Sequence, residues 1–480
     1  MSNTFAPVVN DPLTNGHVVN ANNCPTDDQD VRKELRKLGE PITLFGEREV
    51  ERRERLLRLL SEQRHTDFGI AELERSDDNL MEHTSEEEVD EEEFYTPGLD
   101  ELLASRKYIL ETSVEKAARR LKLQKQQATD YDAARTLKHR RHINSELGEF
   151  ELNGTYTLQG NTRTLSGIRV NSSDNKVACG SWDGNFFILE RGSPDNFKQV
   201  CRLAPGNHTE KVTIAWSPNE EDLLVSGGAE GTLNVWKVTG ESKLKPSTSV
   251  KQAHSGRIAK TEFHPSGKYV TTTSHDQTWR MWDLNRMKDF LVEQEGHDKE
   301  VCAASFHPDG SILATGGLDA IGRIWDLRSG RSIAVLQGHI KGIYSMDWSP
   351  NGYHLASASG DCSVKIWDMR KTEAELFSIP AHTKLVSDVR FLQRIENSPL
   401  AVAQTDETGN NPKVLDASGS YLATSSFDGT VKLWSADNWV AVKTLRGHTD
   451  KVTSCDISRN GLYVVSCGWD RVMRVWSKLV

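Results

Sequence analysis

The chain has 480 residues, and its 59 Lys and Arg against 69 Asp and Glu give a formal net charge of -10 at pH 7. Residues 1–150 hold 22 basic and 32 acidic side chains, which leaves 37 of each in the rest, so this neutral part is not expected to bind duplex nucleic acid broadly. The seven cysteines stand singly and never as Cys-x-x-Cys, which argues against a zinc site and indicates a reducing compartment. The sequence contains no apolar stretch or leader of the kind that would predict a membrane span or secretion.

The N-terminal arm is predicted to start with disorder over residues 1–25, followed by two short helices within residues 26–62. Thr26 and Gln29 resemble a capping box, and a charged second helix is expected from about Glu47 to Leu60. Two such helices are too small for an independent core, so their apolar surface is expected to meet a partner; a hairpin packed only on itself is the alternative. The candidate partner-binding residues, two of which lie further along the chain, are Val31, Leu35, Leu38, Pro41, Leu44, Phe45, Arg52, Arg53, Ile109 and Leu110.

The arm also carries a recognisable motif. The segment from Val31 to Glu47, which reads VRKELRKLGEPITLFGE, is followed by Arg52, Arg53, Arg55 and Leu56. Together these residues resemble the splicing factor motif found in pre-mRNA splicing proteins.

Residues 63–98 are interpreted as an acidic linker, because seven acids fall between Glu86 and Glu93 and repel one another. A basic helical region, residues 99–145, follows, with one long helix expected from Leu99 to about Ala134. Residues 100–141 contain eleven Lys and Arg against six acids. This helix either follows an RNA backbone or packs on the rest of the protein, and the candidate RNA-contacting residues are Arg119, Arg120, Lys122 and Lys125.

The remaining sequence, residues 146–480, is a repeat. Six Trp residues each follow an acid by six positions, and five of them follow a His by 28 positions. The Trp-to-Trp spacing is 46, 43, 42, 67 and 42 residues, close to the roughly 40 to 45 residues of a four-stranded propeller blade. The long interval reflects an insertion near residues 394–416, which is expected to be a surface loop in the sixth blade.

The repeated polar residues are predicted to form structural tetrads, in which an acid fixes a buried His and a hydroxyl links the His to the Trp indole. The five full sets are His254, Thr272, Asp276, Trp282; His297, Thr315, Asp319, Trp325; His339, Ser357, Asp361, Trp367; His382, Thr424, Asp428, Trp434; and His448, Ser466, Asp470, Trp476. The blade that begins at His208 has Glu230 as its acid, and the first blade has Cys179 and Leu189 in place of the hydroxyl and the Trp. A group repeated in every blade indicates architecture, so a hydrolase triad is rejected, and no catalytic residue, metal ligand or cofactor is predicted.

These repeats are similar to the WD40 family, which implies an all-β, seven-bladed WD40 β-propeller behind the α-helical, partly disordered arm. Over nearly the whole chain, the order of motif, linker, helix and ring resembles the WD40 splicing factor of the U4/U6 small nuclear ribonucleoprotein (snRNP). The resemblance implies a non-enzymatic scaffold of the U4/U6 di-snRNP and the U4/U6.U5 tri-snRNP, located in the nucleus, in the spliceosome and nuclear speckles. The implied partners are other U4/U6 snRNP proteins, one with a proline-rich or PWI-type architecture, a snRNP cyclophilin and U4/U6 snRNA, with no membrane and no small-molecule substrate.

A competing interpretation is a substrate receptor of a cullin-RING ubiquitin ligase. Trp325-Asp326-Leu327-Arg328 and Trp367-Asp368-Met369-Arg370 match the Trp-Asp-x-Arg signature of such receptors. Arg after Trp-Asp is, however, common in WD40 blades.

Overall fold

The computed structural model describes residues 28–38, 52–56, 59, 100–129, 131–192, 196–203, 208–238, 243–393, 403–404, 413–414 and 418–478. The chain divides into two compact units, residues 1–95 and residues 96–480.

In the first unit, α1 (Asp28–Lys37) and the helical residues 52–56 form a small apolar cluster. Val31, Leu35 and Leu56 are buried in this cluster. The predicted disordered segment, residues 1–25, and the predicted acidic linker, residues 63–98, lie outside the described residues.

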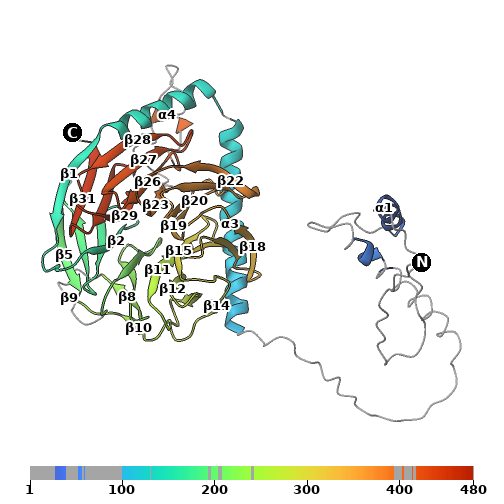
Figure 1. Ribbon diagram of the computed structural model, residues 1–480, viewed down its shortest axis with the longest axis horizontal. Helices are drawn as coiled ribbons and strands as arrows, with labels where there is room; N and C mark the ends of the chain where they lie inside the picture. Colours follow the sequence, from blue (N-terminus) through green and yellow to red (C-terminus); the bar gives the residue numbers. More distant parts are fainter. Residues whose placement is uncertain are drawn as a thin grey trace, which may run out of the picture. The chain divides into compact units, whose positions relative to one another are not determined.

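The second unit is a seven-bladed β-propeller, as predicted (Figure 1). Each blade is built on four antiparallel strands, and in blade one a short fifth strand pairs parallel with the fourth. The first strand of each blade contacts the first strands of both neighbouring blades, which closes the ring. Blades one to three comprise β2 (Leu165–Val170), β3 (Lys176–Ser181), β4 (Phe186–Arg191), β5 (Phe197–Leu203) with β9 (Lys243–Leu244); β6 (Thr213–Trp216), β7 (Leu223–Gly227), β8 (Leu233–Lys237), β10 (Thr248–Val250); and β11 (Ile258–Phe263), β12 (Tyr269–Ser274), β13 (Trp279–Asp283), β14 (Val292–Gln294).

Blades four to six continue the same order along the chain. They comprise β15 (Val301–Phe306), β16 (Ile312–Gly317), β17 (Gly322–Asp326), β18 (Arg331–Leu336); β19 (Ile343–Trp348), β20 (His354–Ser359), β21 (Val364–Asp368), β22 (Lys371–Ile379); and β23 (Val386–Phe391), β26 (Tyr421–Ser426), β27 (Thr430–Ser435), β28 (Ala441–Arg446). The predicted insertion of blade six lies largely outside the described residues, apart from the two-stranded pair β24 (Ala403–Gln404) and β25 (Lys413–Val414).

Blade seven joins the two ends of the propeller. Its strands β29 (Val452–Ile457), β30 (Tyr463–Gly468) and β31 (Val472–Lys478) come from the C-terminus, and its outer strand β1 (Phe150–Thr157) comes from the N-terminal side. β1 pairs antiparallel with β31, from Phe150 opposite Lys478 to Thr157 opposite Val472. The ring is therefore held shut by backbone hydrogen bonds between segments more than 300 residues apart.

Two helices precede β1 where a single long helix was predicted. α3 (Asp100–Thr129) ends before α4 (Ala133–Gly148), so the expectation of one helix to about Ala134 is wrong. The break has a local cause, because Asp132 is extended at φ -116° and ψ 113° and its side chain accepts a hydrogen bond from the Ala134 N–H at 3.0 Å, as an N-cap does. The propeller proper starts at β1 rather than at residue 146.

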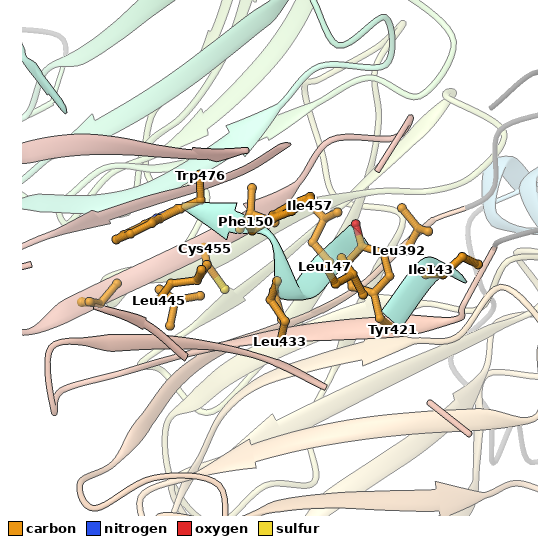
Figure 2. Packing of buried hydrophobic residues seen from close by; sticks show 14 residues of the cluster. Ile143, Leu147, Phe150, Leu392, Tyr421, Leu433, Leu445, Cys455, Ile457 and Trp476 are labelled. Atoms are coloured by element: carbon orange, nitrogen blue, oxygen red, sulfur yellow. The ribbon is translucent and has the colours of Figure 1, made fainter. Parts of the chain in front are cut away.

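α4 packs its apolar face onto blades six and seven (Figure 2). Ile143 and Leu147 lie on Tyr421 and Leu433, in one buried cluster with Trp476. The helix also ends on the propeller, because Lys443 donates to the Gly148 carbonyl at 2.8 Å. α4 thus places the entry to β1 directly against the closing blade.

Candidate interaction surfaces and structural tetrads

The repeated polar residues form hydrogen-bonded chains inside the blades. In blade five, the Trp367 indole donates to Ser357 Oγ at 2.9 Å, Ser357 Oγ lies 2.8 Å from His339 Nε2, and His339 Nδ1 lies 2.8 Å from Asp361. Because Ser357 Oγ accepts from the indole, its own proton goes to Nε2, and the Nδ1 proton goes to the carboxylate. Burial lowers the pKa of His339, so this imidazole is neutral at pH 7.

The same chain recurs around the ring. The hydroxyl-to-indole distances are 2.9, 2.8, 2.9 and 2.8 Å in the sets of His254, His297, His382 and His448. The His-to-acid distances in these sets are 2.8, 3.0, 2.9 and 2.7 Å. Each acid ends its hydrogen-bonded series of side chains. In four of the five full sets the acid also accepts a hydrogen bond from the backbone N–H of the residue after the His, as Asp361 does from Ile340 at 3.3 Å.

The Ser, His and Asp of such a set are the residue types of a hydrolase triad, but their burial differs from that of a catalytic site. Ser357 has no exposed surface, and both sides of its hydroxyl are occupied by Trp367 and His339. A nucleophile must reach a substrate carbonyl, which this hydroxyl cannot do without opening the blade. The Ser-His-Asp sets therefore stabilise the sheets and offer no site for a substrate.

Blades one and two differ from the other blades in the residues at the tetrad positions. In blade two, His208 lies 2.5 Å from Glu230 and 2.7 Å from Ser226 Oγ, so the longer acid keeps the chain intact. In blade one, Cys179 and Leu189 are buried in an apolar cluster. Asp183 there accepts instead from the Thr162 N–H at 2.7 Å. The role of Thr162 was missed from the sequence, because blade one has no His from which to count.

The basic helix α3 lies on the propeller face formed by the turns between the first and second strands of the blades (Figure 1). Lys116 donates to the Pro265 carbonyl at 2.7 Å and Arg120 to Asp309 at 2.6 Å. Gln124 donates to the Asn351 carbonyl at 2.9 Å. Residues spaced by four stand on one side of a helix, so successive turns of α3 contact blades three, four and five in order. Figure 1 shows α3 running along this side of the ring.

The close approach of α3 depends on small and apolar residues. Ile109 has no exposed surface and packs with Tyr269 and Leu327 in one cluster. Gly352 has φ +77°, and a Cβ there would lie 2.7 Å from the Arg120 guanidinium carbon. Only glycine fits both the turn and the helix at this position.

The predicted RNA-contacting residues have different environments. Arg120 is paired with Asp309, and the hydrogen bonds that its guanidinium donates to this carboxylate raise the pKa of Arg120. Arg119, by contrast, is 77% exposed at its side chain and lies near Glu115, while Lys122 and Lys125 are exposed. Three of the four residues are thus accessible to an RNA backbone, and Arg120 is not.

Beneath the C-terminal half of α3 lies a cavity of about 810 Å³ at the mouth of the central channel. Its lining includes Lys116, Arg119 and Lys122 from the helix and Arg169 and Arg390 from the first strands. The channel side chains are paired: Arg169 lies 3.1 Å from Asp388, and Arg390 lies 3.5 Å from Asp347 and 3.8 Å from Glu262. This network was not predicted from the sequence, although charged residues at alternate positions of otherwise apolar first strands are its signal.

The predicted partner-binding residues belong to both units of the chain. Val31, Leu35 and Arg52 are buried within the first unit, whereas Leu38 and Arg53 are half-buried there. Pro41, Leu44 and Phe45 lie outside the described residues. Ile109 is buried against the propeller, and Leu110 beside it is 44% exposed.

The two Trp-Asp-x-Arg signatures have partners inside their own blades. Arg328 donates to Asp326 at 3.0 Å, and Arg370 donates to Asp368 at 2.9 Å. The Arg370 guanidinium also lies 4.8 Å from the centre of the Tyr353 ring. These contacts explain the signature without an external binding partner.

No group of metal-binding side chains occurs in the described part of the chain. The six described cysteines are free, and Cys24 lies outside these residues. None of the described helices combines the length and apolar content that a bilayer crossing demands.

Comparison with known families fits this architecture. The WD domain, G-beta repeat family matches residues 199–237, 245–283, 288–326, 330–368, 409–435 and 439–477, and the first match begins within β5, after the first three strands of blade one. The family described as pre-mRNA processing factor 4 (PRP4) like matches residues 31–59 of the arm. The protein is thus a WD40-repeat propeller carrying a pre-mRNA processing factor motif.

Individual relatives narrow this class. The U4/U6 small nuclear ribonucleoprotein PRP4 of Saccharomyces cerevisiae is 38% identical over 457 residues, which cover 94% of this chain and 90% of that protein. A U4/U6 small nuclear ribonucleoprotein PRP4-like protein of Arabidopsis thaliana is 37% identical over 229 residues, covering 45% of this chain and 38% of that protein. An uncharacterized WD repeat-containing protein of Schizosaccharomyces pombe is 37% identical over 259 residues, 52% of each chain. The chain belongs to the PRP4 family of splicing proteins.

Proposed function

We propose that this protein is a non-enzymatic scaffold of the U4/U6 di-snRNP and the U4/U6.U5 tri-snRNP, acting in pre-mRNA splicing and spliceosome assembly in the nucleus. The proposal rests on the 38% identity with the Saccharomyces cerevisiae U4/U6 small nuclear ribonucleoprotein PRP4, which extends over 94% of this chain. Nuclear speckles are the expected site of accumulation.

The architecture supports a scaffold. A closed ring presents two faces and a rim that are already ordered, so binding several partners carries little cost of ordering the scaffold itself. The tetrads lie inside the blades and α3 lies on a face, so the two sets of polar residues have separate roles. We infer that the ring docks another U4/U6 protein, that the arm engages a snRNP cyclophilin, and that Arg119, Lys122 and Lys125 contact U4/U6 snRNA.

The test is a pull-down of the tagged full-length chain from nuclear extract, with identification of the bound RNA. U4 and U6 RNA are expected with the intact chain and are expected to be lost when residues 26–62 are deleted, while the deleted chain retains a folded ring. The paired changes Arg328→Ala and Arg370→Ala are the matched control, because both guanidinium groups are satisfied within their blades, and they are expected to leave the RNA yield unchanged. Absence of both RNAs from the intact chain would overturn the proposal.

A further inference from the structure

The side of α3 turned away from the propeller carries a second apolar row. Leu103, Leu110, Val114 and Leu121 are 56%, 44%, 57% and 42% exposed. Their spacing of seven, four and seven places all four within a narrow stripe at about 100° per residue, a length of roughly 27 Å along the helix. The buried row of the same helix, which includes Ser105, Ile109 and Ser113, faces the propeller. The helix therefore has a buried face against the propeller and an exposed apolar row, and the described residues cover only the buried face.

The spacing identifies the kind of partner. Leu103 and Leu110 occupy d positions of a heptad, and Val114 and Leu121 occupy a positions, the pattern that a second helix fills by knobs-into-holes packing. Lys107 falls at an intervening a position, where a polar residue fixes the register of the two helices. The flanking e positions 104 and 118 are exposed alanines, which let a second helix approach closely.

Charge decides between another protein and a second copy of this chain. The four apolar residues are spaced symmetrically about residue 112, so two copies could align them in an antiparallel pair. That alignment would place Glu111 beside the same residue of the other copy, because e positions face e positions in antiparallel pairs, and like charges at such positions oppose pairing. A basic residue from a different protein at this layer would instead be favourable.

We propose that the row Leu103, Leu110, Val114 and Leu121 is the docking site for an amphipathic helix of a second protein, with apolar residues at heptad a and d positions, a Lys or Arg facing Glu111 and an acidic or amide residue facing Lys107. This inference rests on the proposed role as an assembly scaffold and specifies one of its protein contacts. The RNA-contacting residues Lys122 and Lys125 lie toward the C-terminal end of the row, so RNA and the second helix can occupy α3 together.

The test uses the full-length chain with Val114 replaced by the photo-reactive p-benzoylphenylalanine, assembled into nuclear particles, irradiated and mapped by mass spectrometry. The same probe at Val440, which is 56% exposed outside α3, is the matched control. The expected adduct joins position 114 to one segment of another protein with heptad apolar spacing and a basic residue at the layer of Glu111, and the probe at Val440 does not reach that segment. An adduct to RNA, to a second copy of the chain, or to no protein in particles that contain U4 and U6 RNA would overturn the inference.

A second measurement protects against a variant that fails to fold. Glu111→Lys changes only an exposed side chain. It is expected to weaken the binding of a synthetic peptide of the mapped segment about fivefold, and changing the facing basic residue of the peptide to Glu is expected to restore binding. The double change Leu110→Asp with Val114→Asp is expected to lower the affinity for the peptide by about tenfold or more. Unchanged peptide affinity in both variants would also overturn the inference. U4 and U6 RNA are measured in the same particles, so loss of the RNA reports on the proposed function and loss of the adduct alone reports on the docking site.

Discussion

Arg120 and Asp309 join α3 to the propeller across 189 residues of sequence. Arg120 Nη2 lies 2.6 Å from the Asp309 carboxylate, and Arg120 Nε lies 3.0 Å from it. The side chains are 15% and 7% exposed, so the pair is largely withdrawn from solvent. Such a pair holds the helix in place mainly because breaking it leaves a buried charge without a partner.

Replacing Arg120 by Ala is therefore expected to loosen α3. Loss of one partner of a buried ion pair costs about 3 kcal/mol, so hydrogen exchange of the α3 amides should accelerate strongly while the blades stay protected. Arg119→Ala is the control, because Arg119 is 77% exposed, and exchange should not change. Equal exchange in the two variants would mean that the ion pair does not hold the helix.

A single hydroxyl connects each tetrad. Ser357→Ala leaves the buried Trp367 indole and His339 without their shared partner and is expected to lower the free energy of unfolding by about 2 kcal/mol. Cys179→Ala at the equivalent position of blade one removes apolar packing and a weak thiol contact with Met473 Sδ at 3.7 Å, and about 1 kcal/mol is expected. Urea unfolding of the two variants measures the difference, and a loss as large for Cys179→Ala as for Ser357→Ala would contradict a special role for the hydroxyl.

Closure by β1 is testable by truncation. A chain that starts at Glu149 keeps β1, whereas one that starts at Leu158 leaves β31 as an open edge strand. The shorter chain is expected to self-associate and to melt at a lower temperature, because an unpaired edge is a template for intermolecular pairing. Both chains lack α4, so this difference isolates the strand. Size-exclusion chromatography with light scattering would refute the expectation if both chains eluted as monomers of equal thermal stability.

The tetrads predict a stability that falls with acid. Burial raises the pKa of Asp361, but hydrogen bonds from Ser363 and His339 outweigh this effect and lower it to about 2. A carboxylate with a lowered pKa contributes stability that is present above its ordinary pKa of about 4 and is lost as the pH falls toward 2. Burial lowers the pKa of His339, so the unfolded chain takes up protons first and stability also declines below about pH 6.5.

The measurement is the urea concentration at the midpoint of unfolding, determined at a series of pH values from about 7 to about 3. A continuous fall is expected, and Asp361→Asn should flatten the part below about pH 4, because one titrating group is gone. A midpoint that stays constant down to about pH 4 would argue against buried neutral histidines.

Salt dependence tests RNA binding by α3. Lys122→Gln with Lys125→Gln should weaken binding of U4/U6 RNA and reduce the slope of log affinity against log salt by about 1 per lost phosphate contact. Lys107→Gln, which removes one positive charge at the other end of the same helix, is the control and should leave the slope unchanged. Equal slopes in all variants would exclude α3 from the RNA interface.

The propeller was predictable from sequence because five of its seven blades repeat one local spacing, the 28 residues from a His to a Trp, as from His339 to Trp367. The structure confirms the seven-bladed architecture. The position of α3 was not predictable. Its anchors Asp309 and Asn351 lie about 190 to 230 residues away and belong to turns whose composition is ordinary for the repeat. The helix break at Asp132 was missed because Ala133 and its successors continue a helical composition, and only the N-cap geometry separates the two helices.

The pairing of β1 with β31 also governs how the protein is made. During translation β1 leaves the ribosome more than 300 residues before its partner strand β31. Until β31 is made, β1 has no partner strand and the incomplete ring exposes unsatisfied backbone groups, so the nascent polypeptide stays vulnerable to chaperone capture or misassembly while the intervening blades are synthesised. A premature stop anywhere before the final strand would therefore yield a product that cannot mature, even if six of its seven sectors were complete.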